Sequence, residues 1–553
     1  MGTSLRRADW RFLLPIPVGD KFRHMVLLGG PSDLAGRLVE IGAAARVSTR
    51  VPVQDSADAL VLLADSRTTL AATAQCLAPE GVLYWELEHR GLSRLRGAGW
   101  IERQLRRTGL HSVGLYWVSP DFAEARRYLP LDHEAAVEWF FATQFIASTP
   151  GRVGLEVLVK AARLIGDPAL ATLVPCCSVV ATRQGRERQP ALPLALADLP
   201  QRPILKRPGT RAVLFTSGQD DGSRAVLLPF APGASAPAVV VKIARLPGFT
   251  GHTEQEQATL TELRSGVDSG LRGSLPEPLG VFGSGAHRVF LESVMPGQVL
   301  AASTGHWRAS AARQISDLRL ATEWLARFHL ATLRRRVRWD ENEVNRWLGR
   351  RFDEYARAFG LEPEENILFA AARERAQSLI GEQIPIVWSH NDFGPWHLYR
   401  SGAEVGVIDW EFGGHELSER WGLPLCDLAY FASHWIYLAR GVDDDGRRLQ
   451  AFRDLFLGRS GTDSRCDAVR LCLADYLQQL QIHCDFLPLL LVYTWVDRAV
   501  DRFGRQASLG ALGASARANN GFASYVGILA QGADTLFSVV QPLPAPASSP
   551  EPR

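Results

Sequence analysis

Two aspartates at the ends of neighbouring apolar runs constrain this chain more than any other feature of its sequence. Residues 384–388 form an apolar run that predicts a buried strand, and the loop after this run contains Asp392. A second apolar run ends at Asp409, and residues 401–402 supply a Ser-Gly turn between the two runs. Because a hairpin brings its two ends together, both carboxylates are expected at neighbouring points of one small sheet.

The two carboxylates suit two different chemical tasks. A carboxylate on a loop can orient a substrate hydroxyl and accept its proton. A carboxylate at a strand end can hold Mg²⁺, which prefers oxygen ligands and usually accompanies substrate phosphates. The alternative is that Asp392 and Asp409 only cap turns, but their placement in one hairpin favours the chemical role.

The residues around both aspartates resemble a known family. His390, Asn391 and Asp392, together with the Ile-Asp-Trp-Glu sequence of residues 408–411, resemble the catalytic loop and the metal-binding strand of aminoglycoside phosphotransferases and choline kinases. These are small-molecule kinases with a two-lobed, protein-kinase-like fold. The resemblance implies that Asp392 is the catalytic base and that Asp409 is the Mg²⁺ ligand.

His397 departs from the pattern of that family, which has an asparagine at this position as a second metal ligand. A neutral imidazole can bind a metal, but it suits softer ions better than Mg²⁺. We therefore expect His397 to be a metal ligand, Mn²⁺ to be an alternative to Mg²⁺, and the activity with Mg²⁺ to be low.

A lysine interrupts a β-branched run at residues 238–244. Burying Lys242 in a strand is costly unless the ammonium group has an anionic partner. Glu256 is the candidate partner, because it shares a face of the next predicted helix with Leu260 and Leu263. The resemblance to small-molecule kinases implies that Lys242 pairs with ATP phosphates and with Glu256. The alternative is an edge-strand lysine whose ammonium group reaches solvent.

Other segments match the kinase resemblance in the expected order. Residues 217–222 form a glycine-bearing turn between two predicted strands, where kinase-like folds cover the nucleotide phosphates. Residues 289–297 follow a second turn at residues 283–285 and resemble the strand and hinge that join the two lobes. Adenine is then expected to contact the main chain near Ser293 and Val294. Asp427 lies at the start of a later predicted helix, as an N-terminal cap or as an acid in a hydrogen-bond network, and we prefer the capping role.

The N-terminal part, residues 21–198, alternates short apolar runs with helical patterns. This alternation predicts a parallel sheet covered on both faces. The order of these strands and helices resembles that of a class I S-adenosylmethionine-dependent methyltransferase. The glycines at 29–30 and residues 77–83 carry this resemblance. The spaced glycines of a nucleotide fingerprint and an acid after Val47 that would bind ribose are missing. We therefore expect a degenerate Rossmann-like domain that does not bind S-adenosylmethionine.

Composition restricts the partners and the compartment. The formal net charge of +2 over 553 residues gives no indication of a nucleic-acid or membrane-surface partner. The 7 cysteines include no C-x-x-C pair, which fits a reducing compartment. No segment reaches the length of about eighteen uncharged apolar residues that spans a bilayer. We expect a cytoplasmic protein without membrane insertion, and the sequence leaves its oligomeric state open.

The sequence therefore predicts two folded parts and a tail. Residues 1–200 are expected to form the α/β Rossmann-like domain, and residues 541–553 a disordered tail. Residues 201–540 are expected to form an α+β kinase-like domain, with a small lobe at 201–297 and a helical lobe at 298–540. The expected function is ATP-dependent transfer of phosphate to a hydroxyl of a small polar molecule, in the sugar or amino-alcohol class. The alternative is a catalytically weak, pseudokinase-like protein that binds nucleotide or serves as a scaffold.

Overall fold

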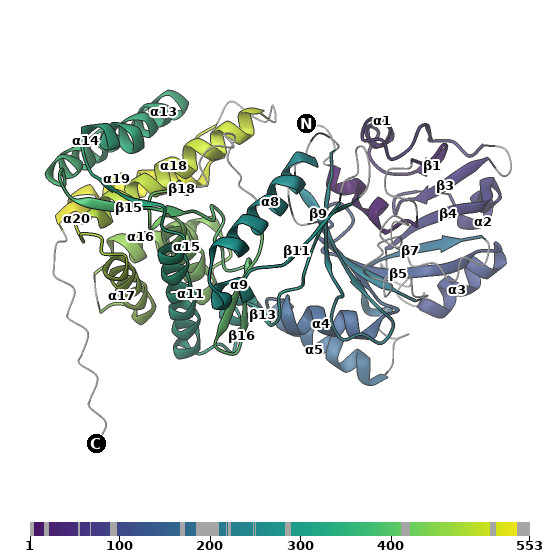
Figure 1. The fold of residues 1–553 in the computed structure, drawn as a ribbon. Coiled ribbons are helices and arrows are strands. Elements are labelled where there is room, and N and C mark those ends of the chain that lie inside the picture. The colour runs from purple at the N-terminus through teal and green to yellow at the C-terminus, as the bar shows by residue number, and fades with distance from the viewer. Residues whose placement is uncertain are drawn as a thin grey trace, which may run out of the picture. The chain divides into compact units, whose positions relative to one another are not determined.

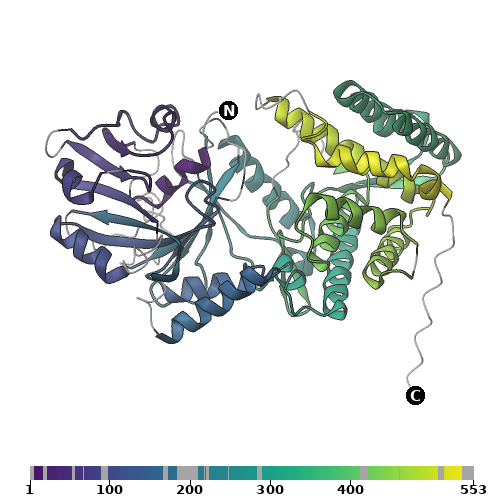
Figure 2. The ribbon, with the colours of Figure 1, turned by 180° about the vertical axis from the view of Figure 1, so that it is seen from behind.

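The chain forms two compact units, which are described separately below (Figures 1 and 2). Unit 1 combines residues 1–145, 151–261 and 276–294, and unit 2 combines residues 146–150, 262–275 and 295–553. The computed structural model describes residues 5–15, 21–52, 56–66, 68–88, 97–165, 172–183, 209–216, 218, 223–246, 248, 250–282, 289–410, 421–459, 461–508 and 516–538.

Unit 1 is built on one mixed sheet of 12 strands, in the order β11-β12-β10-β9-β8-β6-β5-β7-β4-β3-β1-β2. Its strands are β1 (Met25–Leu28), β2 (Val47–Ser48), β3 (Ala57–Leu62), β4 (Leu77–Glu88), β5 (His111–Ser119), β6 (Arg127–Pro130), β7 (Cys176–Thr182), β8 (Arg211–Phe215), β9 (Arg224–Phe230), β10 (Val240–Ala244), β11 (Pro278–Phe282) and β12 (Val289–Glu292). Its helices are η1 (Leu5–Leu13), α1 (Leu34–Glu40), α2 (Leu70–Thr73), η2 (Ala74–Cys76), α3 (Ala98–Arg107), α4 (Glu134–Thr143), α5 (Pro150–Ile165) and α8 (Thr250–Gly266).

The N-terminal strands are parallel, as their continuous apolar runs predict. Strand β1 pairs in parallel with β2 and β3, and β3 pairs in parallel with β4. All four residues of β1 are buried, which is typical of a strand covered on both faces. Strand β7 then runs antiparallel between β4 and β5. The prediction of a parallel sheet is therefore confirmed for β2, β1, β3 and β4.

The glycine loop after β1 is closed by the chain itself. Gly30 donates its amide hydrogen to the Asp65 carboxylate at 2.7 Å. A Cβ atom built on Gly29 would lie 2.5 Å from the same carboxylate, so no side chain other than glycine fits there. Glycines in such a loop are useful to a ligand only where the main chain is open to it. This contact supports the expectation that the domain does not bind S-adenosylmethionine, which stays a prediction.

The sheet does not end with the N-terminal part. The segment that the sequence predicts as a late strand is β5, which pairs with β7 and β6. Strand β6 pairs with β8, with Tyr128 opposite Leu214. The expected N-terminal domain and the expected small lobe thus share one sheet. The expected boundary at residue 200, the glycine turn at 217–222 except Gly218, the turn at 283–285 and the tail from 541 lie outside the described residues.

Unit 2 is mainly helical, with two small sheets. Its strands are β13 (Gln298–Val299), β14 (Arg335–Arg338), β15 (Gln383–Trp388), β16 (Leu398–Ser401), β17 (Glu404–Val407) and β18 (Trp421–Gly422). Its helices are α9 (Ser269–Gly273), α10 (Leu300–Thr304), α11 (Ala311–Ala331), α12 (Glu341–Val344), η7 (Asn345–Gly349), α13 (Arg350–Phe359), α14 (Pro363–Ser378), α15 (Cys426–Ala439), α16 (Asp445–Leu457), α17 (Ser464–Gln479), α18 (Phe486–Ser508), α19 (Gly521–Gln531) and α20 (Ala533–Ser538).

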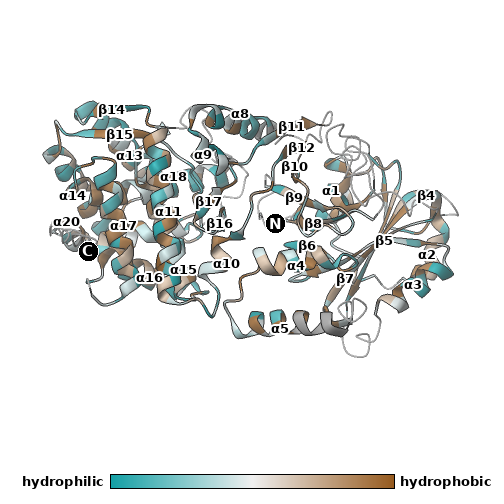
Figure 3. Cartoon of the chain, turned by 60° about the horizontal axis from the view of Figure 1, so that its bottom comes forward, coloured by the Kyte–Doolittle hydropathy of each residue, from teal (hydrophilic) through white to brown (hydrophobic). Residues whose placement is uncertain are grey.

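The hairpin that the sequence predicts is present in unit 2. The turn at 401–402 joins β16 to β17, which pair antiparallel with Leu398 opposite Val407. The apolar run at 384–388 lies in β15, which pairs with β14 and β18 in the other small sheet. The expectation that both apolar runs belong to one small sheet is therefore wrong, because β15 takes other neighbours. Helices such as α11 and α17 carry hydrophilic and hydrophobic residues together (Figure 3). Most of their apolar side chains are buried, and Leu330 and Leu471 are exposed. No described helix combines the length and the apolar character that crossing a membrane requires.

Candidate active site

The loop after β15 is fastened to the end of the β16–β17 hairpin by His390. The buried His390 ring donates its Nε2 hydrogen to the carbonyl oxygen of Ile408 at 2.9 Å, and its Nδ1 accepts from the amide of Asp392 at 3.2 Å. Burial lowers the pKa of His390, which favours this neutral form of the ring. One side chain therefore holds the loop that carries Asp392 against the residue that precedes Asp409.

Asp427 holds the same loop from the other side. Its buried carboxylate accepts from the amides of His390 at 2.6 Å and Asn391 at 2.9 Å. The N-cap residue of α15 is Leu425, which makes no side-chain cap, so the preferred capping role of Asp427 is wrong and its role is that of an acid in a hydrogen-bond network. Asn391 has a φ of 65°, a left-handed conformation that costs about 1–3 kcal/mol and needs support from its surroundings. The two hydrogen bonds of Asp427 supply that support.

Asp392, His397 and Asp409 come together in unit 2. The Nδ1 atom of His397 lies 2.9 Å from the main-chain oxygen of Asp392, and its Nε2 atom lies 3.3 Å from Oδ2 of Asp409. One ligand atom from each of the three residues lies within 4.8 Å of the others. The side chains are 43% exposed at Asp392, 23% at Asp409 and 15% at His397, so Asp392 is the most open of the three.

The hydrogen-bond geometry of His397 leaves room for a cation beside Asp409. A carbonyl oxygen only accepts, so Nδ1 of His397 carries a hydrogen for Asp392. In the neutral ring, Nε2 then presents a lone pair to the Asp409 carboxylate, and two acceptors at 3.3 Å repel each other unless a cation or a second ring proton lies between them. Two carboxylates and one imidazole nitrogen fit a divalent metal, and the nitrogen shifts the preference from Mg²⁺ toward Mn²⁺.

An exposed tryptophan, Trp396, lies in the loop between Asp392 and His397, and the sequence analysis missed it. Trp396 is 37% exposed, and its indole lies over Gly394, where an added Cβ would come within 2.4 Å of the ring. The other neighbours of Trp396 are aromatic, with the ring centroid of His434 at 4.9 Å and that of Tyr430 at 6.2 Å. Partial exposure of so large an apolar side chain in the loop that carries Asp392 makes Trp396 a candidate contact for a small molecule.

Arg498 of α18 is a second residue that the sequence did not single out. Its guanidinium donates to the carbonyl oxygen of Asn391 at 2.7 Å and lies over the Tyr430 ring, 3.8 Å from the centroid. It also lies 3.8 Å from the Asp427 carboxylate. Arg498 therefore helps to hold the loop and neutralises part of the buried charge of Asp427.

Unit 1 contains the lysine cluster. Lys242 is 3% exposed, and its ammonium group donates to Glu256 at 2.5 Å and lies 3.0 Å from Glu292. Arg224 at the start of β9 also pairs with Glu256. Sequence analysis identified Glu256 but missed Glu292 and Arg224. Two cations and two carboxylates form a buried, balanced cluster, as the cost of burying charge requires.

The residues expected to contact adenine lie directly after β12. The amide of Ser293 donates to the carbonyl oxygen of Glu277 at 2.9 Å, and the hydroxyl of Ser293 accepts from the amide of Glu277 at 2.8 Å. Val294 is half-buried. Ser293 is thus fixed to the neighbouring chain, and the role of Ser293 and Val294 in binding adenine stays a prediction.

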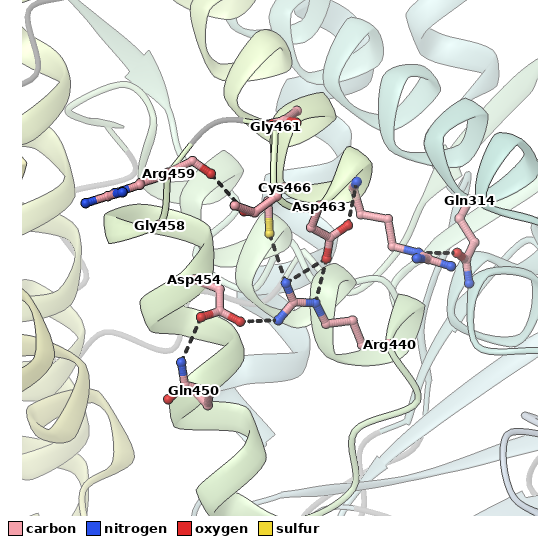
Figure 4. Close-up of polar contacts among 12 residues, drawn as sticks. Gln314, Arg440, Gln450, Asp454, Gly458, Arg459, Gly461, Asp463 and Cys466 are labelled. Atoms are coloured by element: carbon pink, nitrogen blue, oxygen red, sulfur yellow. Dashed lines mark hydrogen bonds and ion pairs between the residues drawn. The ribbon is translucent and has the colours of Figure 1, made fainter.

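A cavity of about 690 Å³ lies elsewhere in unit 2, around Arg440 (Figure 4). The guanidinium of Arg440 donates to Asp454 at 2.8 Å, to Asp463 at 2.7 Å and to the Cys466 sulfur at 3.3 Å. The side chain of Arg465 donates to Gln314 at 2.8 Å. These partners satisfy the polar groups around the cavity within the protein, so we assign this cluster a structural role in joining α15, α16 and α17.

Comparisons with known proteins point to one family. Residues 226–462 match the phosphotransferase enzyme family (APH), and this range includes Lys242, Glu256, Asp392 and Asp409. The match begins at residue 226 and so does not bear on the methyltransferase resemblance of the N-terminal part. A search of curated proteins finds no match to the chain.

Three solved structures illustrate the likeness. A glucosamine kinase is 16% identical, with a TM-score of 0.30 over 55% of this chain and 90% of that chain. An aminoglycoside phosphotransferase from Streptomyces rimosus ATCC10970 is 18% identical, with a TM-score of 0.26 over 47% of this chain and 90% of that chain. A choline/ethanolamine kinase family protein from Mesorhizobium loti is 16% identical, with a TM-score of 0.26 over 56% of this chain and 90% of that chain.

Proposed function

We propose that this chain is an ATP-dependent phosphotransferase that acts on a hydroxyl group of a small polar molecule, in the sugar or amino-alcohol class. The observation that carries the proposal is that the side chains of Asp392, His397 and Asp409 lie together, beside a loop that His390 and Asp427 hold in place. These residues lie within the range that matches the phosphotransferase family. The exposed carboxylate of Asp392 and the three-residue donor set are the two parts that such a reaction needs.

In the proposed reaction, Asp392 positions the acceptor hydroxyl and accepts its proton. The acceptor oxygen forms a bond to the γ-phosphorus of ATP, the bond from that phosphorus to the β–γ bridging oxygen breaks, and ADP leaves with the bond electrons. Lys242, held by Glu256 and Glu292, binds the phosphates and offsets their charge. A divalent metal on Asp409 and His397 would neutralise further phosphate charge.

The second candidate is a catalytically weak protein that binds nucleotide or serves as a scaffold. His397 is the observation that favours it, because an imidazole replaces the oxygen ligand expected at a Mg²⁺ site. Incubation with Mg²⁺-ATP or Mn²⁺-ATP and pools of sugars and amino alcohols separates the two candidates. ADP production that depends on an acceptor supports the first, and nucleotide binding without turnover supports the second.

Replacement of Lys242 tests the nucleotide half of the proposal. Lys242→Ala should raise the KM for ATP by roughly 10- to 100-fold, the size of one charge-assisted contact, and leave the KM for the acceptor unchanged. Because the single variant leaves two buried carboxylates with Arg224, the double variant Lys242→Ala/Glu292→Gln should preserve the charge balance and unfold closer to the wild-type temperature. Steady-state kinetics and thermal unfolding measure both effects.

Lys21→Ala, at an exposed lysine of the same unit, is the matched control and should behave as wild type. An unchanged KM for ATP in the folded double variant would remove Lys242 from the nucleotide site.

Replacement of His397 tests the metal preference. His397→Asn restores an oxygen donor and should raise the Mg²⁺-supported rate about tenfold relative to the Mn²⁺-supported rate. Titration with Mn²⁺, followed by its paramagnetic resonance signal, should show weaker Mn²⁺ binding in the same variant. His111→Asn changes an exposed histidine of unit 1 and should alter neither quantity. If His397→Asn also leaves both unchanged, His397 is not a metal ligand and the site depends on Asp409.

A further inference from the structure

The N-terminal helix η1 is a charged segment in a buried place. All nine of its residues are buried, including Arg6, Arg7, Asp9 and Arg11. In both views it lies against the sheet of unit 1 (Figures 1 and 2, dark purple), and its apolar side chains join the main hydrophobic core. An apolar helix would fill this space without the cost of burying charge, so each charged residue calls for a specific partner.

The first partner lies in the parallel part of the sheet. Arg7 makes two hydrogen bonds of 2.6 Å to the two carboxylate oxygens of Glu86 in β4. Glu86 also accepts from the amide of Ala64 at 3.0 Å and from the Tyr84 hydroxyl at 3.2 Å. This carboxylate is fully satisfied by the fork of Arg7 and two local donors, and it anchors one end of η1.

The second partner lies directly after β10, the strand that contains Lys242. Asp9 accepts from Nε of Arg245 at 2.7 Å and from Arg11 at 3.2 Å, and Arg11 also donates to the Arg245 carbonyl oxygen at 2.9 Å. Burial raises the pKa of Asp9 and lowers that of Arg11 to about 10, so the environment opposes both charges. The charges of the three residues partly offset one another. Asp9 holds the side chain of Arg245, and Arg11 holds its main-chain oxygen.

Arg245 also holds the main chain directly after the end of β8. Its two terminal nitrogens donate to the main-chain oxygens of Gly218 at 2.7 Å and Thr216 at 2.9 Å. Thr216 is itself fixed, because its amide donates to the Arg126 carbonyl oxygen at 2.8 Å. Arg245 is fully buried. A planar guanidinium can hold one carboxylate and two carbonyl groups at once, which a lysine ammonium cannot do in the same geometry.

We propose that helix η1 is a positioning element for nucleotide binding, in which Asp9 orients Arg245 and Arg245 fixes the two carbonyl groups where the chain leaves β8 toward β9. The proposal rests on the proposed function, because the connection between β8 and β9 is where the kinase resemblance places the nucleotide phosphates. Asp9 and Arg245 are positioning residues and do not touch the nucleotide. The Arg7–Glu86 pair attaches the same helix to β4 and, among the residues that the structure describes, makes no hydrogen bond to Thr216 or Gly218.

The two buried pairs of η1 provide a matched experiment. Asp9→Asn and Glu86→Gln each neutralise one buried carboxylate of nearly unchanged shape. Asp9→Asn should raise the Kd for a non-hydrolysable ATP analogue roughly five- to tenfold, and Glu86→Gln should leave it within twofold. Hydrogen exchange of peptides from β8 and β9 should accelerate at least about fivefold in Asp9→Asn alone. The KM for the acceptor should not change in either variant.

Arg245→Lys is the second variant, for use if Asp9→Asn does not fold. It keeps the positive charge beside Asp9 and removes the planar guanidinium that binds Thr216 and Gly218. It should reproduce the loss of nucleotide affinity and the faster exchange. Equal effects of Glu86→Gln and Asp9→Asn on the Kd would show a general loss of stability and overturn the proposal, as would a wild-type Kd in folded Arg245→Lys. If the wild-type protein binds no ATP analogue, the proposed function fails, and hydrogen exchange at β8 and β9 then decides the positioning role by itself.

Discussion

Asp392→Asn is expected to abolish phosphate transfer while nucleotide binding persists. An amide cannot accept the proton of the acceptor hydroxyl, and loss of a general base costs about 10²- to 10⁴-fold in rate. The amide and carbonyl of Asp392 contact His390 and His397 through the main chain, so the substitution leaves these contacts in place. Acceptor-dependent ADP release measures the rate, and calorimetry with ATP measures binding.

The control for this substitution is Asp445→Asn, at a side chain of unit 2 that is 94% exposed. It should keep the wild-type rate. A folded Asp392→Asn variant with the wild-type rate would contradict the assignment of Asp392 as the base. Wild-type protein that binds ATP and transfers no phosphate to any pool would favour the nucleotide-binding alternative instead.

The strand before the site and the turn of the hairpin after it were predictable because local signals define them. The apolar run at 384–388 has the length of a buried strand, and Gly402, with a φ of 65°, takes the left-handed conformation that the turn requires. Lys242 was predictable for a different reason: a charge inside a β-branched run is conspicuous. Glu256 followed from helical spacing.

Several partners in the site could not be predicted, because their roles depend on contacts far along the chain. Asp427 begins a helix and reads as a cap, yet its carboxylate bonds to amides 36 and 37 residues earlier. Glu292 ends a strand, where an acid reads as the polar boundary of an apolar run. Its contact with Lys242 depends on the pairing of β10 with β12. Such pairings are set by the tertiary fold and leave no local pattern.

The same limit applies to the fold of the N-terminal part. No local pattern indicates that residues 5–13, with their arginines, are buried, and the structure buries them through partners 79 and 236 residues away. The pairing of β6 with β8 spans a proline-rich segment that reads as a domain linker. A strand pattern predicts a strand but does not say which neighbour its edge will take.

The backbone conformation of Asp409 determines which substitution tests its role as a metal ligand. Asp409 has a φ of 67°, which aspartate and asparagine adopt more easily than alanine. Asp409→Ala therefore combines loss of a ligand with backbone strain of about 1–2 kcal/mol. Asp409→Asn removes the charge and keeps a side chain that tolerates this conformation, so the two variants separate the ligand from the strain.

Both Asp409 variants are expected to lose metal-dependent activity by about 10²- to 10³-fold, the cost of removing one group that stabilises charge in the transition state. Only Asp409→Ala should unfold at a clearly lower temperature. Titration with Mn²⁺ should show residual weak binding in both, since His397 still offers Nε2. Glu411 lies outside the described residues, and Glu411→Gln in the Asp409→Asn background tests whether this acid supplies any residual metal-dependent rate. Wild-type Mn²⁺ affinity in Asp409→Asn would show that the metal is held elsewhere.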